Sequence, residues 1–474
     1  MKKLTLFSVL LLLALSLQAQ NKKITILSTN DMHAQIEYFP QFAALADSLR
    51  AIDPELIVLG AGDNRTGNPY NDRADIPGMP MVELMNAVGF NASAIGNHEW
   101  DNGWDGFRTL VNAANFPHVC CNINVPDTMR LHIPPYRFLQ AHGVKVGILG
   151  AIQTGSLGIP DCHPDKVQGI TFVQHDSAIV NYEWMRSQCD VLLLLSHDGY
   201  EDDVKTAERY GWFDLIIGGH THTLVPANDV HNGVLISQDK NKFYYATVTH
   251  IEVADGHVVS KTNELINVRG FNSKNEKIAE MVAGFSQNPS LKVKVGTIEK
   301  DLHNTEELGS LMADADLELT GSDIALQNGG GVRFETFDAG DITLGDVLKL
   351  DPFGNHAIVC NFTGREVADF IIACYNKDEK QLPFVAGISY ELTIDRATNT
   401  ATDVKITMLN GKKFDLKHTY RFVTNSYVTA LIPEGHKDKG TDTYEACSDL
   451  LVKYLQKKGS VDYQGVKRVT VIEK

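Results

Sequence analysis

The sequence has few cysteines, no excess of basic residues and, beyond its N-terminal stretch, no long apolar run. The seven cysteines form no Cys-x-x-Cys pair, so their spacing predicts no thiolate zinc site. Acidic residues outnumber basic ones by 59 to 43, which gives a formal net charge of −16. A chain without a broad basic face is a poor partner for a nucleic-acid polymer. A small anionic ligand held by metal ions and a few arginines remains compatible with this charge.

The longest apolar run lies at the N-terminus. Lys2 and Lys3 precede the run LTLFSVLLLLALSL, and Ala19 is followed by polar residues. A basic start, a short apolar stretch and a small residue predict a secretory signal peptide over residues 1–19. The alternative is an uncleaved anchor, but the run is short for a bilayer span. We therefore expect an exported protein, periplasmic or secreted, with no transmembrane segment in the mature chain.

The rest of the chain has the composition of a soluble globular protein, with 43% apolar and 22% charged residues. Over residues 20–267, short runs rich in Ile, Val and Leu alternate with helical patterns, which predicts an α/β domain with a mixed sheet. Residues 268–297 have the pattern of a polar linker followed by a hinge helix. Residues 298–474 predict a second α/β domain.

Residues of metal-binding type follow five of the predicted strands of the first domain, at the point where each strand ends. In α/β sheets, ligands bind beyond the carboxyl ends of the strands, so these side chains are expected to meet at one edge. Each motif alone is weak evidence, whereas all five in this order are a strong signal. The candidates are Asp31, His33, Asp63, Asn97, His98, His197, His220 and His222.

Carboxylates, imidazoles and one carboxamide together suit a pair of divalent metal ions. Two ions about 3.5–4 Å apart clamp the attacking and leaving oxygens of a phosphoryl displacement. Such a pair needs a shared anionic ligand, and Asp63 is the natural bridge. Mixed nitrogen and oxygen ligands suit Mn, Zn, Co or Fe, so the sequence leaves the identity of the metal open.

His98 adjoins a predicted metal ligand and has carboxylates nearby, an arrangement typical of a catalytic imidazole. The alternative is that His98 only supports the metal ligands. Asp101 is one candidate to orient the ring, but Glu99 and Asp105 are also close. The sequence alone does not choose among these three carboxylates.

The order DxH…GD…GNHE…H…GHTH is similar to that of the calcineurin-like metallophosphoesterases. The runs TILSTNDMH, GNHEWD and NGGGVR resemble the 5′-nucleotidase family in particular, which also includes UDP-sugar hydrolases and 2′,3′-cyclic phosphodiesterases. The resemblance spans nearly the whole mature chain. It implies a four-layer αββα metallophosphoesterase sandwich, a hinge helix and a second α/β (α+β) domain that binds the substrate.

The resemblance also implies roles for individual residues. His98 would stabilise the transition state or protonate the leaving oxygen, and Asp101 would orient it. One metal would be held by Asp31, His33, Asp63 and His222, and the other by Asp63, Asn97, His197 and His220.

In the second domain, NGGGVR places consecutive glycines before an arginine, a pattern that can hold a phosphate but is also common in plain loops. By resemblance, Asn328 and Arg333 contact the substrate, and Phe353 and Tyr427 sandwich a nucleobase. Asp442, in GTDTY, resembles a late turn of the family only loosely. One departure is that Leu302 falls near the place where the family often carries a further arginine for the phosphates.

These observations predict a two-metal hydrolase of the 5′-nucleotidase type, in which a metal-bound hydroxide attacks a nucleotide phosphate in line. A 2′,3′-cyclic nucleotide phosphodiesterase or a UDP-sugar pyrophosphatase would use the same metal site. In a non-catalytic nucleotide-binding protein of the cell envelope, some metal ligands should be missing, whereas all seven predicted metal ligands are present. A hinge motion is a hypothesis motivated by the polar linker, and the sequence does not indicate the oligomeric state.

Overall fold

The computed structural model describes residues 21–378 and 380–474, so the predicted signal peptide lies outside the described residues. The chain forms two compact units. Unit 1 comprises residues 21–65, 78–161 and 166–284, and unit 2 comprises residues 66–77, 162–165 and 285–474. We keep residues 20–267, 268–297 and 298–474 as the proposed domain limits. Within the described residues, each helix falls short of the length and apolar character needed to cross a membrane.

Unit 1 is built on two six-stranded sheets. The predicted apolar runs form their central strands. A strand with apolar side chains on both of its faces is stable only where both faces of the sheet are covered. The first sheet has the order β14 (His257–Asn267), β13 (Tyr245–Ala254), β1 (Lys22–Thr29), β2 (Ile57–Gly60), β3 (Ala92–Ala94) and β4 (His118–Val119). The second has the order β11 (Asp229–His231), β12 (Val234–Ser237), β10 (Leu215–Ile217), β9 (Val191–His197), β7 (Val144–Ile152) and β6 (Tyr136–Ala141).

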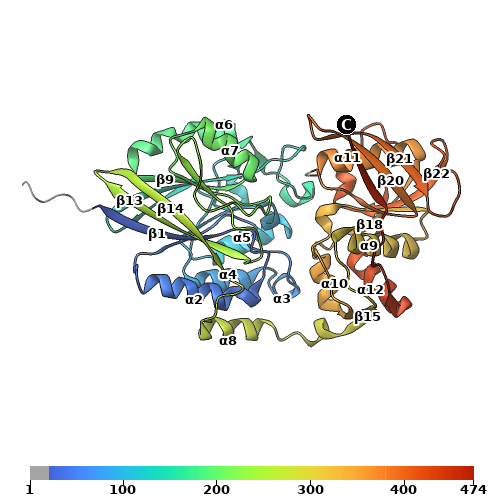
Figure 1. Ribbon diagram of the computed structural model, residues 1–474, viewed down its shortest axis with the longest axis horizontal. Helices are drawn as coiled ribbons and strands as arrows, with labels where there is room; N and C mark the ends of the chain where they lie inside the picture. The colour runs from blue at the N-terminus through green and yellow to red at the C-terminus, as the bar shows by residue number, and fades with distance from the viewer. Residues whose placement is uncertain (1–20, 379) are drawn as a thin grey trace, which may run out of the picture. The chain divides into compact units, whose positions relative to one another are not determined.

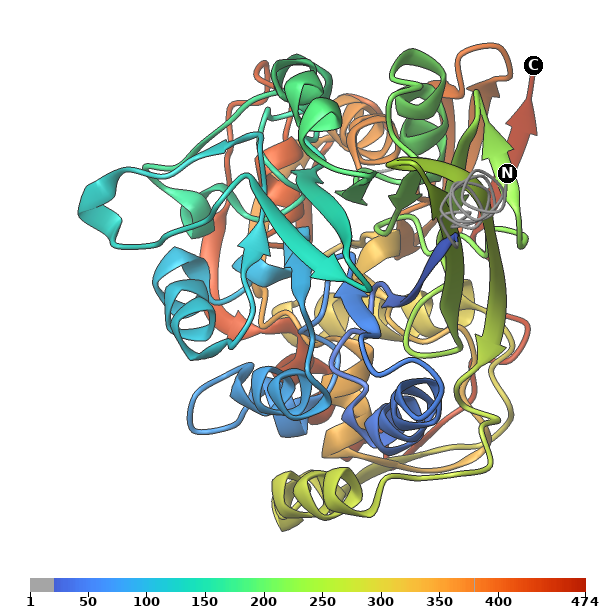
Figure 2. The same cartoon turned by 90° about the vertical axis from the view of Figure 1, so that its left-hand side faces the viewer.

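The two sheets of unit 1 pack face to face, and helices cover their outer sides. Buried side chains of β1, β2 and β3 share one apolar cluster with those of β7, β9 and β10. On the outer face of the second sheet, Ile179, Met185 and Ala207 pack against leucines of β9. Figures 1 and 2 show the helices on opposite sides of the paired sheets, namely α2 (Phe39–Arg50), α4 (Met79–Val88) and α5 (Gly103–Ala113) on one side and α6 (His175–Ile179) and α7 (Tyr200–Arg209) on the other. The predicted αββα order is confirmed.

Unit 2 is a second α/β unit, as predicted, but its strands form three separate sheets. The largest has the order β19 (Phe384–Ala386), β16 (Ile324–Gln327), β22 (Thr419–Asn425), β18 (His356–Thr363) and β23 (Thr441–Ala446). The others contain β17 (Gly340–Thr343), β15 (Lys294–Ile298) and β24 (Ser460–Val461), and β21 (Thr400–Met408), β20 (Ile388–Asp395) and β25 (Val469–Glu473). The helices are α9 (Thr305–Thr320), α10 (Leu344–Leu350), α11 (Gly364–Lys377) and α12 (Cys447–Lys458).

The remaining elements are short, apart from α8 (Glu276–Phe285), which lies within the expected linker. They are α3 (Pro69–Asp72), the strands β5 (Ile123–Asn124) and β8 (Thr171–Phe172), and the 3₁₀ helices η1 (Ile36–Tyr38), η2 (Asn97–Trp100), η3 (Asp127–Met129), η4 (Pro164–Val167), η5 (Val180–Gln188), η6 (Pro289–Lys292), η7 (Gly329–Gly331) and η8 (Val428–Leu431).

The packing between the two sheets of unit 1 can be tested at Gly150 in β7. A Cβ atom at this position would lie 2.1 Å from the carbonyl oxygen of Val119. Backbone atoms cannot yield as a flexible side chain can, so we expect Gly150→Ala to lower the free energy of unfolding by about 1–3 kcal/mol. Urea denaturation measures this change.

Gly284→Ala is the control, because a Cβ at Gly284 in α8 meets no described atom within 4 Å. Alanine is the better helix former by about 1 kcal/mol, so this variant should be at least as stable as the unaltered protein. An unchanged denaturation midpoint for Gly150→Ala would show that the two sheets are less tightly packed than described.

Candidate metal centre and substrate-binding residues

All seven predicted metal ligands lie at the carboxyl ends of strands in unit 1, and the side chains meet. Asp31 and His33 follow β1, Asp63 follows β2, and Asn97 opens η2 after β3. His197 ends β9, while His220 and His222 follow β10 in the other sheet. The main-chain N–H of His220 donates to the Asp31 carboxylate at 3.1 Å from each oxygen, so the two sheets join at this point.

One group of ligands surrounds Asp31. The Nε2 atoms of His33 and His222 lie 3.0 Å apart, and Nε2 of His222 is 3.5 Å from Oδ1 of Asp31. The ligand atoms of these three residues all lie within 4.8 Å of one another. Two imidazole nitrogens and a carboxylate oxygen that converge in this way are typical of a metal site.

A second group contains His197, His220 and Asn97. Nδ1 of His197 is 2.7 Å from the carbonyl oxygen of Ala61, which leaves Nε2 to face Asp63 at 3.3 Å. This Nε2 atom is buried and has no hydrogen-bond partner among the described residues. Nδ1 of His220 lies 3.1 Å from Oδ1 of Asn97, so both atoms can reach one ion. A buried nitrogen without a partner is costly unless a ligand completes the site.

Asp63 lies between the two groups, where a shared ligand is required. Its Oδ2 atom is 3.9 Å from Nε2 of His33 and 3.3 Å from Nε2 of His197. Burial alone would raise the pKa of Asp63, but the charges of His197, His98 and His33 lower this pKa well below its usual value. Burial lowers the pKa of His197, yet Asp63 and Asp31 raise it to about 10. The site therefore favours positive charge, which divalent cations supply.

The backbone at the ligands adopts a conformation that L-residues rarely occupy. Asp31, His33, Asp63, His220 and His222 have φ angles of 46°, 45°, 50°, 78° and 55°. Left-handed backbone is disfavoured by contact between the Cβ atom and the main chain. Residues held in this way cluster at functional sites, where the surrounding structure keeps them in place.

Glu99 joins the loops that carry Asp63 and Asn97. Its buried carboxylate accepts main-chain N–H groups of Asp63 at 3.0 Å, Asn64 at 2.9 Å and Gly96 at 2.6 Å. Glycine is required at position 96, since a Cβ atom there would lie 2.1 Å from Oδ1 of Asp63. The loops therefore approach each other too closely for a side chain at this position.

The geometry selects Asp101 from the three carboxylates near His98. Nδ1 of His98 lies 3.0 Å from Oδ2 of Asp101, which orients the ring. Glu99 binds main-chain amides, and Asp105 pairs with Arg108. Nε2 of His98 lies 3.9 Å from Oδ2 of Asp63, so the ring borders the metal ligands.

The residues predicted to bind substrate in unit 2 form two pairs and one separate residue. Nδ2 of Asn328 and the hydroxyl of Tyr427 both donate to Asp378, each at 3.1 Å. The guanidinium carbon of Arg333 lies 5.6 Å from the centre of the Phe353 ring. Asp442 instead lies beside β18, where its carboxylate is 3.1 Å from Nδ1 of His356.

Comparison with known proteins agrees with this arrangement. The family model for calcineurin-like phosphoesterases matches residues 24–224, and the model for the C-terminal domain of 5′-nucleotidases matches residues 282–431. The chain therefore matches both a calcineurin-like phosphoesterase domain and the C-terminal domain of 5′-nucleotidases, in the order that its motifs predicted. Two divalent metal ions are the cofactors of its metallophosphoesterase domain, and the ligand groups described above fit them.

Several known proteins resemble the chain over most of its length. Protein UshA of Yersinia enterocolitica is 28% identical over 93% of the chain and 92% of its own length. The trifunctional nucleotide phosphoesterase protein YfkN of Bacillus subtilis is 27% identical over 93% of the chain, which spans only 33% of that longer protein. The 5′-nucleotidase precursor of Thermus thermophilus has the same fold, with a TM-score of 0.85 at 23% identity, over 95% of this chain and 99% of that one.

Two residues near these sites carried no signal in the sequence. Asp161 lies in the loop after β7, with Oδ2 3.6 Å from Nε2 of His220, and its carbonyl oxygen accepts Nδ2 of Asn97 at 3.2 Å. Asp378 follows the last residue of α11. Neither stands at a strand end or in a known motif, so only the folded chain reveals them.

Leu302 has a structural role in unit 2. It is 1% exposed, belongs to the apolar core of unit 2 and pairs with Phe337 through two main-chain hydrogen bonds. The position near which the family often carries an arginine is therefore part of the core.

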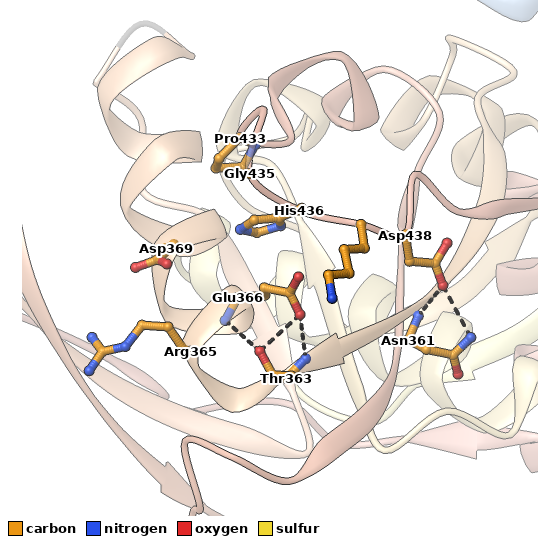
Figure 3. Close-up of a pocket in the computed structure, with 10 residues that line it drawn as sticks. Asn361, Thr363, Arg365, Glu366, Asp369, Pro433, Gly435, His436 and Asp438 are labelled. Atoms are coloured by element: carbon orange, nitrogen blue, oxygen red, sulfur yellow. Dashed lines mark hydrogen bonds between the residues drawn. The ribbon is translucent and has the colours of Figure 1, made fainter.

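A cavity of about 640 Å³ lies on another part of unit 2 (Figure 3). It is lined by β18, the first turns of α11 and the loop 433–438. Arg365 and Lys437 face it together with Glu366, Asp369 and Asp438, so its charges favour no single class of ligand.

The Asp161 carboxylate lies 3.6 Å from Nε2 of His220, so its removal should loosen one metal site. Carboxylates that orient metal-binding histidines typically contribute about 10–100-fold to metal affinity. We expect Asp161→Ala to weaken Mn²⁺ binding at one site by this factor, measured by calorimetric titration. The exposed Asp127 in the same unit provides the control variant, Asp127→Ala. Equal affinities in the two variants would contradict a role for Asp161.

Proposed function

We propose that this chain is a metal-dependent hydrolase that releases phosphate from nucleotides. The observation that carries the proposal is the convergence of seven predicted metal ligands, among which Asp63 faces both His33 and His197, with His98 at the edge of the group. The comparisons support the same proposal, since the relatives include proteins named as 5′-nucleotidases and as a nucleotide phosphoesterase. An exported location, periplasmic or secreted, is part of the proposal.

Asp63 and His98 have different roles, one in binding and the other in proton transfer. When bound, two divalent ions supply positive charge that stabilises the phosphoryl oxygens during displacement. Asp63, with ligands on either side, fixes the place of this charge. His98 can hold or donate a proton at Nε2, because Asp101 engages the opposite nitrogen at 3.0 Å.

Unit 2 supplies groups suited to the rest of a nucleotide. The guanidinium of Arg333 can bind a phosphate through two parallel hydrogen bonds. Phe353 and Tyr427 provide aromatic rings on which a base can stack. Asn328 has a hydrogen-bonding side chain beside Tyr427, with Asp378 between them.

A diesterase or pyrophosphatase activity, on 2′,3′-cyclic nucleotides or UDP-sugars, is the second candidate. It is favoured by the place of Leu302 in the apolar core, because the phosphate contacts there must differ from those of relatives that carry an arginine. The metal ligands would be the same for each substrate.

The decisive experiment measures hydrolysis of AMP, UDP-glucose, 2′,3′-cyclic AMP and p-nitrophenyl phosphate with added Mn²⁺, Zn²⁺ or Co²⁺. We expect AMP to be the best substrate. Asp63→Ala should reduce hydrolysis to background because the bridge between the ligand groups is lost, and a chelator should do so because it removes the ions. Asp127→Ala serves as the surface control. Activity that survives both Asp63→Ala and the chelator would refute the proposal.

Replacing Asp101 tests the assignment of His98. Asp101→Asn removes the charged acceptor that orients the ring, so we expect kcat to fall about 10–100-fold while KM changes little. Steady-state kinetics measures both, and the bound metal content should stay constant. Asp105→Asn removes a neighbouring carboxylate that pairs with Arg108 and should keep kcat. Equal kcat values for the two variants would exclude Asp101 as the orienting group.

A further inference from the structure

A buried carboxylate in unit 2 joins two of the residues proposed to contact the nucleotide. Oδ2 of Asp378 accepts the Asn328 amide, and Oδ1 accepts the Tyr427 hydroxyl, each at 3.1 Å. Asn425 extends the group, because its Nδ2 donates to Oδ1 of Asn328 at 2.9 Å and its Oδ1 accepts the N–H of Val428 at 3.1 Å. We call Asn328, Asp378, Asn425 and Tyr427 the Asp378 cluster.

The Asp378 cluster brings together the ends of three elements. Asn328 follows β16, Asn425 ends β22, and Asp378 follows α11, where its N–H donates to the carbonyl oxygen of Cys374 at 2.9 Å. Tyr427 precedes η8. The positions of these side chains are therefore fixed by the secondary structure that ends at each of them.

Burial makes these hydrogen bonds important. Asp378 is 6% exposed, and Asn328 and Asn425 are 4% and 1% exposed. A buried carboxylate is tolerated only when donors satisfy its oxygens, and each oxygen of Asp378 accepts a hydrogen bond. Moving the Tyr427 hydroxyl or the Asn328 amide away would leave a buried acceptor without its donor, so the carboxylate holds both side chains in one orientation.

We propose that Asp378 is a positioning residue for nucleotide recognition, which holds the Tyr427 ring and the Asn328 amide ready for the base and its sugar. The inference rests on the proposed function, because it gives Asp378 a role only where the substrate carries a nucleoside. Asp378 acts through its two partners and has no part in the displacement at phosphorus.

The physical basis is preorganisation of an aromatic ring. A tyrosine ring that is free to rotate must be ordered when a base stacks on it, and this ordering weakens binding. The hydrogen bond from the hydroxyl to Asp378 fixes the ring before the substrate arrives. Stacking on an aromatic side chain is part of the binding of a base, so partial loss of the orientation is expected to weaken affinity about fivefold to tenfold.

Two conservative variants isolate the contact. Tyr427→Phe removes only the hydroxyl. Asp378→Asn keeps the size of the side chain but replaces one of the two acceptor oxygens with an NH₂ group, which faces one of the two donors. For each variant we expect the KM for AMP to rise about fivefold to tenfold, with kcat changed less than about twofold. The double variant should be no worse than the poorer single variant, because both changes break one contact.

A substrate without a nucleoside separates positioning from general damage to the fold. The kcat/KM for p-nitrophenyl phosphate should stay within about twofold of the unaltered protein in every variant, since no base is present to stack. Calorimetric binding of adenosine, which needs no turnover, should weaken by the same factor as the KM for AMP rises.

Tyr463→Phe is the matched control, because Tyr463 also donates its hydroxyl to a carboxylate of unit 2, that of Asp314 at 2.8 Å. This variant should leave the KM for AMP unchanged. The inference is overturned if Tyr427→Phe and Asp378→Asn bind AMP and adenosine as the unaltered protein does, or if p-nitrophenyl phosphate is affected equally. If the unaltered protein hydrolyses p-nitrophenyl phosphate but no nucleotide, the proposed function fails instead.

Discussion

The rest of unit 1 depends on the contacts of one buried group, the Asp63 carboxylate. It is 2% exposed, yet it faces imidazole nitrogens of His33, His197 and His98 within 3.9 Å and accepts the His98 N–H at 2.9 Å. A buried anion of this kind is tolerated only where positive charge or donors surround it. The two sheets bring those groups from the ends of β1, β3 and β9. The buried charge of Asp63 is therefore tolerated only when unit 1 is folded in this way.

The backbone around Asp63 shows how the fold meets this requirement. Five of the seven predicted metal ligands have left-handed backbone, and the loops are close enough that position 96 admits only glycine. Each such feature is unfavourable alone. The face-to-face sheets, whose shared core includes Leu59, Ala94 and Leu195, hold the strand ends in place. Glu99, through three main-chain amides, fixes the loops between them.

The sequence predicted the parts of this arrangement that depend on periodicity. Apolar runs that end in Asp or His mark both the strands and the edge where ligands gather, so an α/β domain and the meeting of Asp31 with His220 follow from the pattern. The αββα order was instead implied by the resemblance to the metallophosphoesterases. The direction in which a side chain points within a turn leaves no such pattern in the sequence. Glu99, Asp101 and Asp105 all lie within a few residues of His98, and only the folded chain shows which one faces the ring. Asp161 and Asp378 lie in loops, where side-chain contacts depend on distant segments.

Asp63 and Asp378 show that the donors around a buried carboxylate decide what it can do. At Asp63 the neighbours are imidazoles, which can give up protons and turn their lone pairs toward a cation. At Asp378 an amide N–H and a phenol O–H donate to the two oxygens, so the carboxylate is satisfied by neutral donors. The first environment therefore favours a metal, whereas the second favours a fixed orientation of neutral groups. By this argument, unit 1 is suited to hold the charge that acts on phosphorus, and unit 2 to hold a ring and an amide for a base.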